Sequence, residues 1–592
     1  IAIVLSALFS QDPRMTLFGD LFNPFSAVAL MTLPAIVYLV RTLPEGIRQR
    51  LKYLIVTLLS ISSFIFVMAL MFSGNIISTA TKLFSGFSSS LSFGVYVGLF
   101  VVACFFFVRK IELHNKYKAA IIITAVLFTS WILSLSSQNN IRPNMESTFF
   151  VGKNVLLNDG IFGIGAGNFS RAWQLYRPQS VISSQYFGYD FNLGSDTMGT
   201  FFVTIGIVGL VAFLILVLSA LYSTYISYRQ SNRGTKEHTI LGLLTLVLLY
   251  FALVSWTVPL SYAMLVVWMV ISGLGLAKAK LSEYHPSKKL AIIMIPLAVL
   301  LIVNSAITIQ KSRAFSVFSK AQSVQQGDLA LPLFAQATSL YKFDGFYRAE
   351  VEYMIQLNRN LVSNTTLPQD ELKSKYIMNA SSSIDAGLQA VSANRNNYQN
   401  YVSLGRAYEL IIPFNKDEGY APAKKAYEEA VKLYPENPYL YVMLARLEAS
   451  VGSKDGVRIQ LTEALKKKQN FADALYLMSQ LEASDNQIDG ALSYAIEAVK
   501  NAPNDPLVYI QAGLLYYGKK DYQNAVSALS TALQKDPNNA NVAYFLALSL
   551  RDGGRVDLAK QIADELLKRN PGNAELKTFI KSLEPATVKD KK

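Results

Sequence analysis

The stretch DPLVYIQAGLLYYGKKDYQNAVSALSTALQKDP, residues 505–537, decides the fold of the C-terminal half of this 592-residue chain. Its apolar residues recur at helical spacing. The small residues Gly513, Ala525 and Ala532 stand where two helices would have to approach closely, and Pro537 closes the unit. The stretch therefore predicts a pair of closely packed helices.

The same pattern recurs along the chain with a period of 34 residues. Five markers define that period: Pro435, Gln469, Pro503, Pro537 and Pro571. Small residues follow the markers at 10, 22 and 29 positions: Ala445, Ser479, Gly513 and Ala547; then Ala491, Ala525 and Ala559; then Ala464, Ala498 and Ala532. This is the period and the small-residue pattern of tetratricopeptide repeats, whose helix pairs stack into an α-solenoid.

The repeats divide the C-terminal half. YVSLGRAYEL at 401 matches YVMLARLEAS at 441, with six extra residues near IIPFNK explaining the longer step. We expect degenerate helical repeats over 310–394, split by NTTLPQ at 364–369. A tetratricopeptide solenoid over 395–586 follows, with a capping helix at 574–584 and a frayed tail at 587–592. Solenoids of this kind bind other proteins on a concave face, so we expect a protein partner.

The N-terminal half has the composition of a membrane protein. The whole chain is 52% hydrophobic and 16% charged, whereas soluble proteins carry about 25% charged residues. After an apolar start at 1–9, eight stretches are long enough to cross a bilayer: 22–41, 52–72, 91–109, 118–136, 200–227, 238–255, 258–277 and 289–309. We predict an all-α protein, a polytopic helical membrane bundle over 1–309 followed by the α-solenoid. Because Ile1 already lies in an apolar run, we expect further membrane helices before it.

The basic residues orient these spans. Residues 1–309 hold 21 Lys and Arg against 10 Asp and Glu. Fifteen of the basic residues fall in alternate loops, at positions 41–52, 109–118, 229–236 and 278–289. Cytoplasmic loops carry such an excess, so we attribute the charge to membrane topology and not to nucleic-acid binding. The protein is expected in the cell membrane, with the loop 137–199 and the repeats outside the cytoplasm.

The loop 137–199 is the long polar segment of this half. Loops between helices are usually short, so its length, aromatic residues and charges indicate a binding or active surface. Gly163, Gly165 and Gly167 in GIGAG predict a tight turn with positive φ. A nucleotide-binding loop would need a strand before it and a helix after it, which this setting does not offer.

Several motifs in this half occur in a fixed order. LSALFSQDPRMTLFGD at 5–20 is followed by Arg142 in IRPNMEST and by NDGIFGIGAGNF at 158–169. Trp173, Tyr176 and Pro178 come next, then TFFVTIGIVGL at 200–210. In this order the motifs resemble the bacterial O-antigen ligase and polymerase superfamily, some members of which also continue into tetratricopeptide repeats.

The resemblance implies a metal-independent glycosyltransferase without a cofactor. It would move a glycan from a polyprenyl-pyrophosphate carrier at the outer face of the membrane. Arg142 would stabilise the pyrophosphate, since arginine binds phosphate by paired hydrogen bonds. Arg171, Trp173, Tyr176 and Arg177 would contact the substrate.

Two residues of the family's pattern are missing. The family's histidine falls at Ser195, and its second arginine is absent from SSSLSFG at 88–94. Asp196, or next Asp190, would have to serve as the base, although Asp196 also fits a helix cap before the 200–227 helix. The alternative function is therefore a non-catalytic membrane-anchored scaffold whose repeats recruit proteins of the cell envelope. A transporter is disfavoured because the spans lack internal charge.

The sequence also limits metal and disulfide chemistry. The single cysteine, Cys104, lies in an apolar run, so no disulfide forms within the chain. The three histidines, His114, His238 and His285, lie in loops assigned to the cytoplasmic side. We therefore expect no metal centre.

Overall fold

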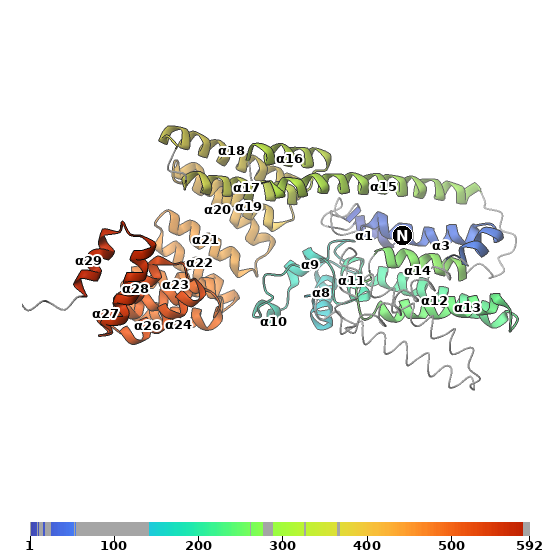
Figure 1. Cartoon of the computed structure of the whole chain (residues 1–592). Coiled ribbons are helices and arrows are strands. Elements are labelled where there is room, and N and C mark those ends of the chain that lie inside the picture. Colours follow the sequence, from blue (N-terminus) through green and yellow to red (C-terminus); the bar gives the residue numbers. More distant parts are fainter. Residues whose placement is uncertain are drawn as a thin grey trace, which may run out of the picture. The chain divides into compact units, whose positions relative to one another are not determined.

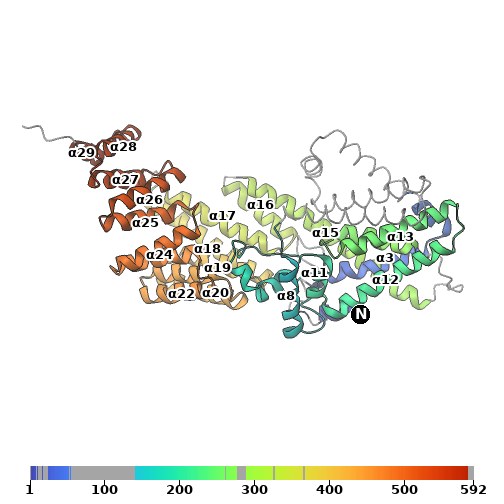
Figure 2. The same ribbon diagram turned by 90° about the horizontal axis from the view of Figure 1, so that it is seen from below.

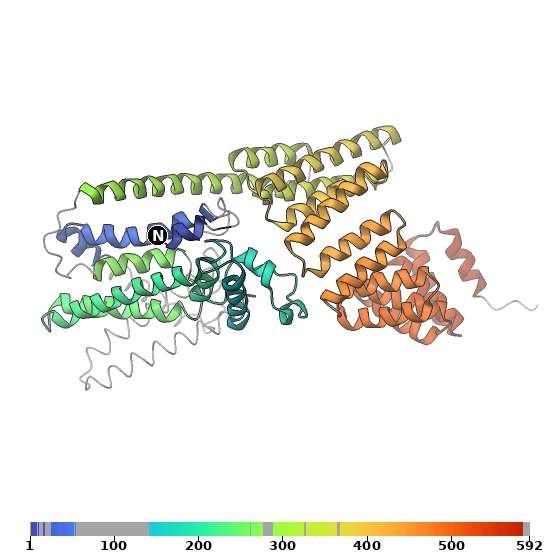
Figure 3. The same ribbon diagram turned by 180° about the vertical axis from the view of Figure 1, so that it is seen from behind.

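The computed structural model describes residues 2–8, 10, 16–17, 25–52, 54, 141–260, 262–275, 288–324, 327–363 and 367–583. Over these residues every regular element is an α-helix (Figures 1 to 3). The chain forms two compact units. The first comprises residues 1–178 and 189–347, and the second comprises residues 179–188 and 348–592.

The first unit is built around long apolar helices. Its helices are α1 (Ala2–Leu8), α3 (Ala27–Thr42), α8 (Met145–Asn158), α9 (Phe169–Tyr176), α11 (Thr197–Thr204), α12 (Gly206–Gln230), α13 (Lys236–Val254), α14 (Tyr262–Gly275), α15 (Lys288–Ser323) and α16 (Gly327–Leu340). The fully buried Trp268 of α14 lies at the centre, with its ring centroid 5.6 Å from that of Phe213 and 5.8 Å from that of Phe251. Helices α3, α12, α13 and α14 thus share one core.

Two helices of the described residues, α12 and α13, are long and apolar enough to cross a membrane. The bent pair 27–41 and 45–52 would make a third span. The predicted spans at 91–109 and 118–136 lie outside the described residues, as does the predicted span at 52–72 apart from Lys52 and Leu54. The structure therefore confirms a helical protein but not the predicted polytopic bundle. The predicted boundary at residue 309 falls inside the continuous helix α15.

The predicted span 200–227 differs from the observed helices. The chain begins helix α11 at Thr197, breaks at Ile205, and starts α12 at Gly206. Gly206 has a φ of +69°, and a Cβ atom there would lie 2.1 Å from the carbonyl oxygen of Ile161. The helix is interrupted because the backbone of the preceding loop packs directly against it, which a local pattern does not reveal.

The second unit is a stack of helix pairs. It contains α10 (Gln179–Ile182), most of α17 (Asp344–Val362), α18 (Gln369–Ala393), α19 (Tyr398–Glu409), α20 (Lys416–Leu433), α21 (Pro438–Ser450), α22 (Lys454–Lys467), α23 (Ala472–Ser484), α24 (Ile488–Asn501), α25 (Pro506–Gly518), α26 (Tyr522–Lys535), α27 (Ala540–Asp552), α28 (Val556–Arg569) and α29 (Ala574–Ser582). The extra residues near 411–416 lie in the connection between α19 and α20, residues 410–415, and at the start of α20. The solenoid predicted from the 34-residue period is confirmed.

The period is set by helix caps two residues after each marker. The N-caps of the first helices are Asn437, Phe471, Asp505, Asn539 and Asn573. Four of them accept a hydrogen bond from a backbone N–H in the first turn, as in the 2.9 Å bond from Leu507 N to Asp505 Oδ1. A side-chain cap satisfies a donor that the first turn leaves free, so these four repeats restart a helix at a fixed place, whereas Phe471 makes no such bond.

The small residues of the repeats are buried between the paired helices. Ala464, Ala498 and Ala532 are fully buried, as are Ala491, Ala525 and Ala559. At Gly513, a Cβ atom would lie 2.6 Å from Cγ of Leu529 on the partner helix. The helices can approach closely only because these positions carry little side chain.

Ten residues of the predicted loop belong to the repeat unit. The segment 179–188 packs where α22 ends and α23 begins. The ring of Phe187 lies 5.2 Å from that of Phe471, and Lys468 Nζ lies 4.0 Å from the centre of the Phe187 ring. Lys468 Nζ also donates to Ser184 O at 2.7 Å, and Gln179 Nε2 donates to Lys467 O at 2.9 Å. The chain thus enters the repeat unit and leaves it again within the loop.

Candidate functional site

The glycine-rich stretch of the loop is a tight turn held against the start of α12. Gly163, Gly165 and Gly167 have φ values of +75°, +112° and +80°, which confirms the predicted turn. Gly165 N donates to Thr204 O at 2.9 Å, and Ile164 N donates to Val203 O at 3.2 Å. Side chains would obstruct this approach, so the glycines position the loop on the helices.

Arg142 and Asp196 are neighbours, although they lie near opposite ends of the described part of the loop, residues 141–199. The Arg142 side chain is half-buried, and burial lowers the pKa of its guanidinium, while the Asp196 carboxylate opposes that shift. Within the described part of the chain, the guanidinium makes no hydrogen bond or ion pair. A half-desolvated cation without hydrogen bonds is a site at which an anion could bind.

Asp196 is the N-cap of α11. Its Oδ1 accepts a 2.7 Å hydrogen bond from Gly199 N, and Ser195 Oγ donates to Oδ2. The residue is buried, at 4% exposure. The alternative interpretation of Asp196 as a helix cap therefore describes its observed contacts, and its role as a base stays a prediction.

Asp190 faces Arg177 and not Arg142. Arg177 Nη2 donates to Asp190 Oδ1 at 2.7 Å, and Gln174 Nε2 donates to Asp190 Oδ2 at 3.3 Å. The Arg177 side chain is fully buried, and its guanidinium carbon lies 5.3 Å from the centre of the Trp173 ring. Trp173 is itself fully buried and donates from Nε1 to Tyr189 O at 3.1 Å. In the observed structure these predicted substrate residues pack inside the loop.

Tyr176, Asp159 and Arg171 form a second internal group. Tyr176 donates from its hydroxyl to Asp159 Oδ2 at 2.9 Å. Burial, together with this bond, raises the pKa of Tyr176 to about 12. Burial lowers the pKa of Arg171, with Tyr176 and Asp159 opposing the shift. Of the predicted site residues, Arg142 is thus the one whose charged group is left available within the described structure. Among the described residues, no group of three His, Cys, Asp or Glu side chains could hold a metal ion.

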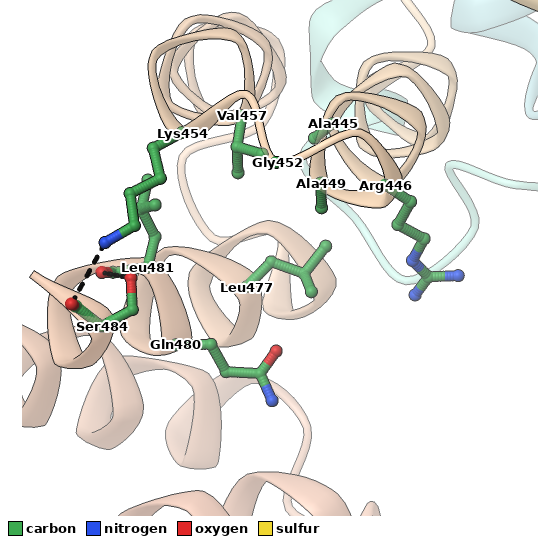
Figure 4. A pocket seen from close by; sticks show the side chains of 10 residues that line it. All are labelled: Ala445, Arg446, Ala449, Gly452, Lys454, Val457, Leu477, Gln480, Leu481 and Ser484. Atoms are coloured by element: carbon green, nitrogen blue, oxygen red, sulfur yellow. Dashed lines mark hydrogen bonds between the residues drawn. The ribbon is translucent and has the colours of Figure 1, made fainter. Parts of the chain in front are cut away.

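The repeats contain a hollow that sequence reasoning did not locate. It lies between the first helices α21 and α23 and the start of α22, with a volume of about 330 Å³. Its walls are apolar side chains, and polar residues stand at its ends (Figure 4). The lining residues are Ala445, Arg446, Ala449, Gly452, Lys454, Val457, Leu477, Gln480, Leu481 and Ser484. The hollow exists because small residues recur on α21 where a larger side chain would fill the space.

The polar ends of the hollow differ. Lys454 Nζ donates to Ser484 O at 3.1 Å and pairs with Asp485 Oδ1 at 2.6 Å, so it is already engaged. Arg446 stands on the opposite side of the apolar walls (Figure 4) and is exposed. Its guanidinium makes no hydrogen bond to any described residue, although Glu409 and Asp473 lie within electrostatic range. A ligand in the hollow would make apolar contacts with the walls and could accept hydrogen bonds from the N–H groups of the Arg446 guanidinium.

The comparisons with known proteins concern the repeats. Residues 516–583 match the family model described as tetratricopeptide repeat. A tetratricopeptide-repeat-containing protein of Methanocaldococcus jannaschii is 28% identical over 170 residues, which is 27% of this chain and 29% of that protein. The match thus spans about three tenths of that relative's length. The repeats of this chain are tetratricopeptide repeats. Neither match concerns the O-antigen ligases, so that resemblance stays a prediction.

Three similar solved structures are those of YrrB, PilF and PilW. YrrB, described as a tetratricopeptide protein with an unusual peptide-binding site, is 18% identical, with a TM-score of 0.27, over 34% of this chain and 99% of its own. Pseudomonas aeruginosa PilF is 13% identical, with a TM-score of 0.30, over 40% of this chain and 99% of its own. PilW, a type IV pilus biogenesis factor, is 13% identical, with a TM-score of 0.30, over 39% of this chain and 98% of its own.

Proposed function

We propose that this protein is a membrane-anchored scaffold whose tetratricopeptide array binds a segment of a partner protein. The observation that carries the proposal is the apolar hollow between α21 and α23, with Arg446 at its rim making no hydrogen bond to any described residue. Helices α12 and α13 supply the anchor, by their length and composition. The basic residues of the loops favour an extracytoplasmic position for the repeats.

The hollow suits a large apolar side chain of the partner. Ala445, Ala449 and Val457 leave room above Leu477 and Leu481, and those five side chains offer no hydrogen bond that a polar group could use. Burial of one leucine or phenylalanine side chain contributes about 1.5–3 kcal/mol. The Arg446 guanidinium would then bind a carbonyl or carboxylate oxygen next to that residue. We infer a short extended segment with one apolar anchor.

A peptide-display selection on the full chain in nanodiscs tests this proposal. Selected peptides should share a large apolar residue, and their affinity should fall at least tenfold in Ala449→Trp, which fills the hollow. Ala449 is exposed, so the new side chain need not disturb the core. Ala421→Trp, at an exposed alanine of α20, is the matched control and should bind like the wild type. Equal binding by both variants would exclude the hollow as the site.

A second candidate function is the transfer of surface glycans from a polyprenyl-pyrophosphate carrier. The observation in its favour is the half-buried Arg142, which makes no hydrogen bond within the described residues and lies near Asp196. A pyrophosphate would supply the hydrogen bonds that this guanidinium lacks. The roles of Asp190 and Arg177 in such a site are less favoured, because they are paired with each other.

Glycan transfer in isolated membranes distinguishes this candidate. Wild type should transfer glycan and Arg142→Ala should not, because the pyrophosphate would lose its bidentate partner. Arg233→Ala, at an exposed arginine between α12 and α13, is the control and should retain activity. Transfer at wild-type rate by Arg142→Ala would remove Arg142 from the reaction. Absence of transfer in the wild type would leave the scaffold as the sole function proposed.

A further inference from the structure

Helix α8 exposes four large apolar side chains and buries small and polar ones. Its exposed side chains include the apolar Met145, Phe149, Phe150 and Leu157, at 59%, 63%, 45% and 70% exposure, together with the charged Glu146 and Lys153. Its buried side chains are smaller or more polar: Ser147, Thr148, Val151, Gly152 and Val155. At 3.6 residues per turn, the four exposed apolar side chains fall within an arc of roughly 140°. A helix that packs on a protein core in water shows the opposite arrangement.

The buried face of α8 is fixed to the helices that lead into the membrane spans. Helix α8 packs against α9, α11 and α12. A Cβ atom on Gly152 would lie 2.3 Å from the Phe202 ring, and the Phe149 ring stacks on Phe202 with centroids 5.9 Å apart. Figures 1 and 2 show α8 at the end of the bundle where α12 begins, lying across the helices instead of alongside them.

Helix α12, against which α8 packs, also carries an exposed apolar stripe. Exposed apolar residues recur on α12 at intervals of three or four: Ile207, Val211, Ile215, Leu218, Tyr222 and Tyr225. Ile161, just after α8, is 50% exposed, and its carbonyl accepts a hydrogen bond from Val208 N at 3.4 Å. The residues just after α8 therefore contact the start of α12, and both helices expose apolar side chains near this contact.

We propose that α8 lies in the interfacial layer of the membrane, with its exposed apolar face in lipid. The occupant is a lipid surface because α8 packs against the start of a helix long and apolar enough to span a bilayer. Helices that lie in the interface bury one apolar face at the boundary of headgroups and acyl chains. Glu146 and Lys153 are exposed on the same face, and the long side chain of Lys153 can reach a lipid phosphate.

This placement sets the depth of the candidate anion site. Arg142 lies three residues before the first residue of α8, and Asp196 begins the helix on which α8 packs. With α8 in the interface, the Arg142 guanidinium stands at the level of the lipid phosphates. The inference rests on the membrane anchor of the proposed function but not on the peptide-binding hollow.

Spin labelling of single-cysteine variants tests the proposal. Cys104→Ser removes the one native cysteine. Labels are then placed at Phe149 or Leu157 on α8, at Leu218 of α12 and at Gln185. The full chain is reconstituted in vesicles of phosphatidylcholine and phosphatidylglycerol, and collisions with oxygen and with a water-soluble nickel chelate are measured. The α8 labels should meet oxygen more often than nickel, at a depth between those of Leu218 and Gln185.

Two results would overturn the proposal. Nickel accessibility at Leu157 equal to that at Gln185 would place α8 in water. Low accessibility to both reagents would show that protein covers the face. Leu157 is 70% exposed, so its substitution should leave the fold intact even if Phe149→Cys disturbs the stacking on Phe202. A water-like reading at Leu218 would refute the membrane anchor itself, which separates failure of that premise from failure of the α8 assignment.

Discussion

Phe187 holds the segment 179–188 on the repeat array, and its loss should release that segment. Phe187→Ala removes three contributions. Burial of a phenylalanine contributes about 1.5–3 kcal/mol when complete, hence roughly half of that for this partly buried ring. The edge-to-face contact with Phe471 adds about 0.5–1.5 kcal/mol. The Lys468 ammonium over the ring adds about 0.5–2 kcal/mol, since Lys468 is only 7% exposed.

These contributions share the same contacts and do not add fully, so we expect a loss of about 2–3 kcal/mol. That corresponds to a roughly 30- to 150-fold increase in local opening. Hydrogen exchange followed by mass spectrometry measures the opening directly, on peptides covering 179–188 and the turn between α22 and α23.

The matched control for this experiment is Gln185→Ala, which changes an exposed residue of the same segment. It should alter exchange less than twofold. If Phe187→Ala leaves protection of 179–188 unchanged, the segment is not held by this ring and the reasoning fails. Unfolding of the whole array in Phe187→Ala would also contradict the reasoning, because Phe187 is expected to hold only the segment 179–188.

Three further perturbations test other parts of the structure. Gly513→Val forces a side chain against the neighbouring helix and should lower the unfolding free energy of the array, measured by urea titration, by about 1–3 kcal/mol. Gly518→Ala is the control: its new Cβ atom meets no atom within 4 Å, so the unfolding free energy should hardly change. Equal losses in the two variants would contradict the close packing at Gly513. Burial raises the pKa of Glu350 from 4.5 to about 7, so the folded state binds more protons and stability should fall as the pH rises between those values. Glu350→Gln should abolish that decline in melting temperature and stabilise the protein at pH 8; an unaltered pH profile would refute the assignment. Gly206→Ala places a side chain at positive φ against a carbonyl oxygen and should reduce the unfolding free energy by roughly 2–4 kcal/mol, which lowers the melting temperature in detergent. An unchanged melting temperature would show that the break before α12 does not require glycine.

The repeat array could be predicted from sequence because its determinants are local and periodic. The caps Asn437 and Asp505 follow their proline markers by two residues, and the small residues return at fixed offsets. The positive φ of Gly163 was predictable for a similar reason, since glycine tolerates it without cost.

Other features depend on contacts distant in the chain, which no local pattern encodes. The break before Gly206 results from the backbone at Ile161, and the pairing of Asp190 with Arg177 follows from how the loop folds on itself. The attachment of Phe187 to Phe471 joins residues 284 positions apart. The hollow between α21 and α23 arises from two successive repeats together, so neither repeat shows it alone.

The most direct test of the central claim is photo-crosslinking from the hollow in intact cells. A benzophenone amino acid at Ala449 should crosslink a defined segment of one partner protein, because its side chain points into the space that the partner occupies. The same residue at the exposed Ala421 of α20 should give no such product. Identical crosslinks from both positions, or none from Ala449, would contradict the account of this protein as a scaffold that binds through that hollow.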